Sequence, residues 1–224
     1  MRARIAAIDT TSEYGSLALI QDGEVREEIL VESPDGFGHV LFPQLEALLS
    51  RHGWLPEDVD CFACASGPGS FTGIRVGLAA VKGLGEALNK PVVAVSNLRA
   101  IAWHGKWPLR AAVLDARRGE VYAAVFSATL ELLAPEVVLP YSLWAETLPE
   151  GELEILSTDF SAFRHVFAAP CFAHAQLTEV PRALAGATGR IASGHLASGT
   201  ATSPGEADAN YVRRSDAELL WKER

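Results

Sequence analysis

The chain has 224 residues, and its 19 lysines and arginines are outnumbered by 28 aspartates and glutamates, which gives a formal net charge of -9. Neutralising nucleic-acid phosphates needs a basic surface, so the charge argues against strong direct binding of nucleic acid by this chain alone. No apolar run reaches the length that spans a bilayer, and the first residues make a poor signal peptide. We therefore expect a cytosolic protein with a hydrophobic core and no membrane contact.

The first half of the chain predicts the strands and helices of an α/β domain. An apolar strand at 4–9 ends in an aspartate, and strands at 16–20 and 25–31 are joined by Asp22-Gly23, a dipeptide typical of hairpins. Hydrophobic periodicity then predicts a helix at 40–49, a strand at 59–65, a long helix at about 72–88, a strand at 91–95 and a helix at 96–103.

The second half of the chain starts in the same way. A strand at 109–115 ends in Asp115, a turn follows at 116–119, and a paired strand follows at 121–126. The pattern weakens after this point and predicts only a strand at 154–157, a helix at 182–196 and a loop at 198–209. Because both halves open with an apolar strand, a terminal aspartate and a hairpin, the sequence indicates two related α/β lobes.

The long helix at 72–88 is apolar on two sides. Its charged residues share one narrow stripe, whereas a surface helix is normally polar over much of its circumference. Glycine or valine recurs every four residues at 73, 77, 81 and 85, which predicts a low ridge for the close approach of another helix. We therefore predict that this helix packs beside the helix at 40–49 and that both meet equivalent helices of a partner. The predicted contact residues are Val40, Leu41, Leu45, Leu48, Ile74, Leu78, Val81 and Gly85.

Three turns are candidates for binding phosphate groups. They contain Asp9, Thr10 and Thr11 after the first strand, Gly67, Gly69 and Ser70 before the long helix, and Asp115 in the second half. Carboxylate oxygens suit Mg²⁺, and the free N–H groups of a helix start attract anions. The same residues are also ordinary turn formers and helix caps, and the Gly-Pro-Gly-Ser turn matches neither common nucleotide fingerprint. From the residues alone we favour a turn and a helix cap at Gly67, Gly69 and Ser70, and both interpretations stay open for Asp9 and Asp115.

The sequence contains no motif for metal binding by paired histidines or for a serine nucleophile. The six histidines include no pair four residues apart, so no metal site is predicted, and no Gly-x-Ser-x-Gly nucleophile elbow is present. Cys61 and Cys64 are three positions apart on a predicted strand, so their side chains should face opposite sides of the sheet. We expect both to be buried as small hydrophobic residues.

Three sequence blocks, in this order, resemble the bacterial TsaB (YeaZ) family: IDTTS at 8–12, GPGSFTGIR at 67–75 and DARRGEVY at 115–122. The segment Tyr211-Val212-Arg213 is similar to the family's terminal Tyr-Leu-Arg. The resemblance spans nearly the whole chain, although residues from about 128 to 207 contribute little. Ser66 stands where the family often has an arginine, which weakens the case for anion binding at the turn that follows.

The resemblance implies an α/β protein with the two-lobed actin-like ATPase fold of the Hsp70 and sugar-kinase superfamily. The N-terminal lobe at 1–103 would carry the partner-binding helices, and the C-terminal lobe at 104–224 would be reduced. The implied function is that of a non-catalytic subunit of the complex that installs N6-threonylcarbamoyladenosine at position 37 of tRNAs that read ANN codons.

The partners implied by this resemblance are a TsaD-like catalytic subunit, which transfers the threonylcarbamoyl group, and a TsaE-like ATPase. A homodimer is expected when the chain is alone, and tRNA is expected to bind only through the partner. No cofactor is required, and binding of a nucleotide at the partner interface is left open. The alternatives are a nucleotide-dependent small-molecule kinase of the same fold and a glycoprotease-like peptidase.

Overall fold

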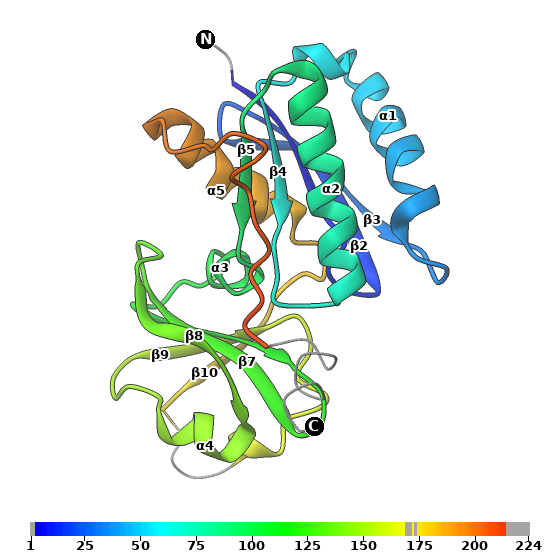
Figure 1. Cartoon of the computed structure of the whole chain (residues 1–224). Coiled ribbons are helices and arrows are strands. Elements are labelled where there is room, and N and C mark those ends of the chain that lie inside the picture. Colours follow the sequence, from blue (N-terminus) through cyan, green and yellow to red (C-terminus); the bar gives the residue numbers. More distant parts are fainter. Residues whose placement is uncertain (1–2, 169–171, 173, 214–224) are drawn as a thin grey trace. The chain divides into compact units, whose positions relative to one another are not determined.

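Two five-stranded mixed sheets form the framework of the chain (Figure 1). The computed structural model describes residues 3–168, 172 and 174–213. One compact unit comprises the described residues up to Asn97 together with Ala183–Asn210, and the other comprises Leu98–Arg182 and the described residues from Tyr211 onward. This division differs from a boundary between residues 103 and 104, because the segment from Ala183 to Asn210 returns to the first unit.

The first sheet has the strand order β3-β2-β1-β4-β5. β1 pairs antiparallel with β2 and parallel with β4. The predicted hairpin between β2 and β3 is confirmed, since Asp22 and Gly23 have φ angles of 55° and 80°, as a two-residue type I′ turn requires. The strands are β1 (Arg4–Asp9), β2 (Tyr14–Gln21), β3 (Glu24–Glu32), β4 (Cys61–Ala65) and β5 (Val92–Val95).

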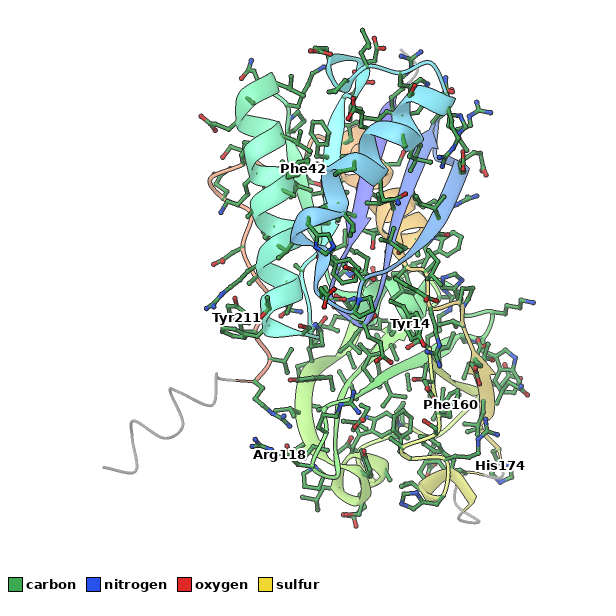
Figure 2. All side chains as sticks on the ribbon, turned by 90° about the vertical axis from the view of Figure 1, so that its right-hand side faces the viewer. Tyr14, Phe42, Arg118, Phe160, His174 and Tyr211 are labelled. Atoms are coloured by element: carbon green, nitrogen blue, oxygen red, sulfur yellow. The ribbon has the colours of Figure 1, made fainter. Side chains whose placement is uncertain are left out.

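Helices cover both faces of the first sheet. The helices α1 (Leu41–Arg51) and α2 (Phe71–Leu88) lie side by side on one face, as predicted, and α5 (Ala185–Ser198) lies on the other face (Figure 1 and Figure 2). Short 3₁₀ helices, η1 (Phe37–His39) and η2 (Pro56–Asp58), flank α1.

The two cysteines of β4 confirm the alternation of side chains across the sheet. Cys64 belongs to the core under α1 and α2, whereas Cys61 belongs to the core under α5. Burial raises the pKa of each thiol to about 12, so both stay protonated at neutral pH. They behave as small hydrophobic residues, as the sequence predicts.

The helix α5 is held against the first sheet by small residues and by bonds at its first turn. An added Cβ at Gly189 would overlap the side chain of Ile20, so only glycine allows this close approach. The hydroxyl of Ser16 accepts bonds from two amides at the helix start, and the carboxylate of Glu28 accepts a third. The helix predicted at 182–196 is thus present, and it belongs to the first unit.

The second sheet repeats the topology of the first. Its order is β8-β7-β6-β9-β10, and its antiparallel and parallel pairs follow in the same sequence as in the first sheet. This repetition confirms the prediction of two related lobes. The strands are β6 (Leu109–Asp115), β7 (Glu120–Ser127), β8 (Leu132–Pro140), β9 (Leu153–Ser157) and β10 (Gln176–Glu179), and the helices are α3 (Asn97–Ala102), α4 (Tyr141–Glu146) and η3 (Val166–Ala168).

The core of the second unit contains a cluster of aromatic rings. Neighbouring rings meet edge to face, with a centroid distance of 5.8 Å between Phe160 and Phe163. The sequence did not predict β8, which contains Pro135 and Pro140, but it lies at the edge of its sheet, where proline is tolerated. The aromatic residues of this core are Trp144, Phe160, Phe163, Phe167 and Phe172.

Glu154 is a buried carboxylate that joins three segments of the second unit. It is 2% exposed and accepts bonds from the N–H groups of Lys106 (2.6 Å) and Trp107 (3.0 Å) and from the hydroxyl of Thr178 (2.6 Å). Burial by itself raises the pKa of this carboxyl, but the three bonds outweigh burial and hold the pKa below its usual value.

We predict that Glu154→Gln lowers the free energy of unfolding at neutral pH by about 1–3 kcal/mol, because the ionised acceptor is lost. A carboxyl with a lowered folded-state pKa stabilises the fold above its unfolded-state pKa and loses this effect as the pH falls through the folded-state value. The difference between parent and variant should therefore shrink at pH values below 4.5, the ordinary pKa of the group. Urea unfolding at neutral and acidic pH measures this, with Glu150→Gln at an exposed position as the control. Equal stability of the parent and Glu154→Gln at neutral pH would contradict the assigned role.

Candidate functional site

The turn after β1 is buried, and its Thr11 forms hydrogen bonds with Asp9, the last residue of β1. Asp9, Thr10 and Thr11 are at most 3% exposed. The Asp9 Oδ1 atom accepts bonds from the Thr11 N–H at 2.9 Å and from the Thr11 hydroxyl at 2.7 Å. The Asn97 Nδ2 group donates in turn to the Thr11 hydroxyl oxygen at 2.6 Å. Burial raises the pKa of Asp9, and the bonds from Thr11 and Asn97 oppose this shift.

The Gly-Pro-Gly-Ser turn between β4 and α2 lies against the turn after β1. The Gly67 N–H donates to Asn97 Oδ1 at 2.9 Å, and the Ser70 N–H donates to the Thr11 carbonyl oxygen at 2.6 Å. Ser70 is the N-cap of α2, because its hydroxyl oxygen accepts the Gly73 N–H at 3.2 Å. The structure thus brings together the two turns that the sequence singles out in the first unit, and Ser70 has the capping role.

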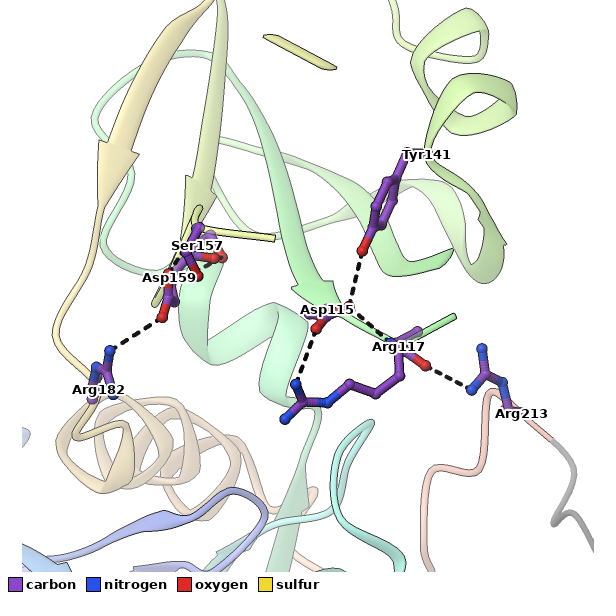
Figure 3. A network of polar contacts seen from close by, with 9 residues as sticks. Asp115, Arg117, Tyr141, Ser157, Asp159, Arg182 and Arg213 are labelled. Atoms are coloured by element: carbon purple, nitrogen blue, oxygen red, sulfur yellow. Dashed lines mark hydrogen bonds and ion pairs between the residues drawn. The ribbon is translucent and has the colours of Figure 1, made fainter. Parts of the chain in front are cut away.

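Asp115 occupies the same place in the second unit, at the end of β6, and it is also bound by its own chain (Figure 3). Its Oδ1 atom accepts bonds from the Arg117 N–H at 2.8 Å and from the Tyr141 hydroxyl at 3.0 Å. The Arg117 guanidinium lies 3.5 Å from Oδ2. Burial, followed by the bond to Asp115, raises the pKa of Tyr141 to about 12.

The hairpin tip after Asp115 has an uncommon backbone. Arg117 and Arg118 have φ angles of 64° and 57°, a left-handed conformation that non-glycine residues adopt only with strain. Arg213 braces the hairpin, since its guanidinium donates to the Ala116 carbonyl oxygen at 2.7 Å (Figure 3). The same guanidinium pairs with Glu120. The sequence marks Arg213 only as part of a motif, and no local pattern connects Tyr141 to Asp115.

Most residues predicted for the partner contact lie inside the first unit. Val40 is half-buried, and the other seven, Leu41, Leu45, Leu48, Ile74, Leu78, Val81 and Gly85, are buried. Part of α2 is covered by the segment at 202–210, which the sequence predicts only as a loop. The Lys82 ammonium donates to the Ala207 carbonyl oxygen at 2.7 Å, and an added Cβ at Gly85 would lie 2.9 Å from Pro204. The apolar side chains for which the sequence predicts a partner are therefore covered by the chain itself. This corrects the prediction that these seven residues contact another chain.

The outward face of the two helices carries a different set of residues. On α1, Phe42 is 50% exposed (Figure 2). On α2, Ala79 and Gly83 are exposed, and an added Cβ at Gly83 would meet nothing within 4 Å. A pocket of about 510 Å³ opens beside the start of α2, between the turn after β1 and the segment after β3, with Glu13 and Glu32 in its lining. This face, rather than the buried set, is available for contact with another chain.

Residues 3–168, 172 and 174–213 contain neither a metal-binding cluster nor a membrane-spanning helix. Among them, no three histidine, cysteine, aspartate or glutamate side chains lie close enough together to hold a metal ion. No helix formed by these residues has the length and apolar composition needed to cross a membrane.

Comparison with known sequences connects the chain to one tRNA modification pathway. A family model described as TsaD: tRNA N6-adenosine threonylcarbamoyltransferase matches residues 37–172. The chain is 31% identical over 157 residues to the tRNA threonylcarbamoyladenosine biosynthesis protein TsaB of Bacillus subtilis, an alignment that covers 68% of this chain and 69% of that protein. It is 34% identical over 150 residues to the protein of the same name from Escherichia coli, with 60% and 64% covered.

Two solved structures resemble the chain over both units. One is the crystal structure of an uncharacterized protein with similarity to peptidase YEAZ from Pseudomonas aeruginosa, with a TM-score of 0.80, 27% identity, and 94% of this chain and 100% of that chain covered. The other, YeaZ from Pseudomonas aeruginosa, has a TM-score of 0.78, 27% identity, and 93% and 99% covered. Together with the repeated sheet topology, these likenesses confirm the predicted two-lobed, actin-like α/β fold.

We predict that Tyr141→Phe, which keeps the ring and removes only the hydroxyl, lowers the free energy of unfolding by roughly 1–2 kcal/mol, because the bond to the Asp115 carboxylate is lost. Asp115→Ala, which removes the acceptor, and the double variant complete a double-mutant cycle measured by urea unfolding. The two residues share a contact, so the effects should be non-additive. Strictly additive effects would show that the bond does not contribute to stability.

Proposed function

Because this chain belongs to the TsaB family, we propose that it is a non-catalytic subunit of the complex that installs N6-threonylcarbamoyladenosine at position 37 of tRNAs that read ANN codons. The observation that carries this proposal is the 31% identity to the Bacillus subtilis protein, an alignment that covers 69% of that protein's length. The likeness to YeaZ over 93% of this chain agrees with it. We expect the protein to act in the cytosol.

The non-catalytic role is supported by the state of the two aspartates that end β1 and β6. In a working phosphate or metal site these carboxylates would face the ligand. Here Asp9 is bound by Thr11, and Asp115 is bound by Arg117 and Tyr141. The sequence also lacks a histidine pair at metal-binding spacing. We therefore propose that another subunit performs the transfer and that this chain needs no cofactor.

The proposed partner is a TsaD-like catalytic subunit that meets the outward face of α1 and α2. The TsaD family model matches residues 37–172, a range that includes both helices, so the two subunits have related helices available for pairing. When the partner is absent, the same face should pair with a second copy of this chain about a two-fold axis. A TsaE-like ATPase is expected to join the complex. A nucleotide at the partner interface and indirect contact with tRNA remain expectations of the same proposal.

We predict that Gly83→Glu weakens binding to the TsaD-like partner about tenfold or more, because the added side chain keeps the partner from approaching the helix closely and leaves a charge buried in the interface without a partner. The variant should fold, since the added side chain enters open space. Analytical gel filtration and calorimetric titration with the purified partner measure both self-association and partner affinity.

Gly194→Glu is the matched control for this experiment. Gly194 also lies within a helix, is exposed and has open space around its Cβ position, but it belongs to α5 on the other face of the sheet. Parent-like binding by Gly83→Glu, or equal weakening by Gly194→Glu, would remove the outward face of α2 from the interface.

We predict that the isolated chain neither modifies tRNA nor binds it tightly at physiological salt, because its net charge of -9 offers few phosphate contacts. Modification is measured with threonylcarbamoyl-adenylate as donor, with and without the TsaD-like partner, and tRNA binding is measured by fluorescence anisotropy. Modification by the chain alone would contradict the non-catalytic role. Steady ATP turnover or casein cleavage by the pure chain would instead favour the kinase or the peptidase alternative.

A further inference from the structure

The turn after β1 and the first turn of α2 are in direct contact, and Thr10, Ser70 and Gly73 also line the pocket of about 510 Å³ beside this contact. An added Cβ at Gly69 would lie 2.5 Å from the Thr11 carbonyl oxygen, and one at Gly73 would overlap the carbonyl group of Thr10. Both positions therefore need glycine for steric reasons. The contact therefore fixes the distance between the two backbones at these positions.

Two hydrogen bonds join the buried turn to the start of α2. The Thr10 hydroxyl donates to the Gly73 carbonyl oxygen at 2.7 Å, and the Ser70 N–H donates to the Thr11 carbonyl oxygen at 2.6 Å. Ser70 is the N-cap and Gly73 lies three residues later, so the bonds hold both ends of the first helical turn. The bond between Thr10 and Gly73 is buried, so water does not compete for its donor and acceptor.

Asn97 connects the same turn to the loop that leads into α2. It is 2% exposed, and both ends of its side-chain amide are used. Its Nδ2 group donates to the Thr11 hydroxyl oxygen, and its Oδ1 atom accepts the Gly67 N–H. The Asn97 N–H also donates to the Gly67 carbonyl oxygen at 2.8 Å. The loop before α2 is thus fixed at Gly67 and at Ser70 to one buried cluster.

We propose that Thr10, Thr11 and Asn97 are positioning residues for the partner-binding face of α2. A helix is stiff along its length, so a shift of its first turn also displaces the outward residues Ala79 and Gly83. The partner-binding part of this inference rests on the proposed function. The fixing of the helix concerns the full chain by itself.

The first experiment uses the full chain without a partner. Thr10→Val removes the hydroxyl donor at nearly constant volume, and we expect the amides of Ser70 and Gly73 to exchange with solvent about tenfold faster while the amides of α5 keep the parent rate. Thr10→Ser, which restores the donor, should restore the parent exchange rates.

The second experiment compares partner affinity at equal stability. Val113→Ala removes two methyl groups from a fully buried side chain in β6 of the second unit and serves as a destabilised control without a change near α2. Thr10→Val should weaken binding of the TsaD-like partner by about tenfold more than this control does, and Thr10→Ser should bind like the parent.

Two results would overturn the inference. These are parent-like exchange at Ser70 and Gly73 in Thr10→Val, and partner affinity of Thr10→Val equal to that of Val113→Ala. Failure of the parent itself to bind the partner would instead overturn the proposed function. The exchange measurement would then decide alone whether the cluster fixes the helix.

Discussion

The parallel pairing of β1 with β4 is the constraint on which the first unit depends. Ile5 pairs with Cys61 and Ile8 with Cys64, so the two strands end at the same edge of the sheet. This edge is where open α/β sheets usually bind ligands. Here the two turns that leave it contact each other directly, and their polar groups bind one another. A buried carboxylate such as Asp9 is tolerable only because its own turn supplies the bonds that replace water.

The second unit meets the same constraint in a different way. β6 pairs in parallel with β9, but Asp115 is bound by the hairpin tip and by Tyr141 from α4, not by a neighbouring helix start. The end of β9 is closed separately, where the Ser157 hydroxyl donates to the Asp159 carbonyl oxygen and Arg182 pairs with the Asp159 carboxylate (Figure 3). The Arg117 side chain remains 84% exposed in this arrangement. The strand ends of the first sheet therefore form contacts inside their unit, whereas the hairpin tip after β6 presents a charged side chain to solvent.

Local pattern was enough to predict the hairpin at Asp22-Gly23, the repeated strand with its terminal aspartate, and the opposite directions of Cys61 and Cys64. These features depend on turn chemistry and on the two-residue period of a strand. The brace between Tyr141 and Asp115 joins residues 26 positions apart and leaves no periodic trace in the sequence. The sequence also does not predict that residues 202–210 cover α2, because a loop rich in small residues gives no sign of what it packs against.

The glycines of α2 show how one pattern can support two interpretations. Their four-residue recurrence is typical of a surface where another helix approaches closely. In the structure Gly73 meets the Thr10 carbonyl group, an added Cβ at Gly77 would lie 2.8 Å from the Thr10 hydroxyl oxygen, and Gly85 lies against Val92 and Pro204. The small residues therefore serve contacts with the helix's own unit, and each allows an approach that a methyl group would block. Since the inward side of α2 is already occupied, a partner can meet only the outward side, and the position of that side is set by the contacts made at these glycines.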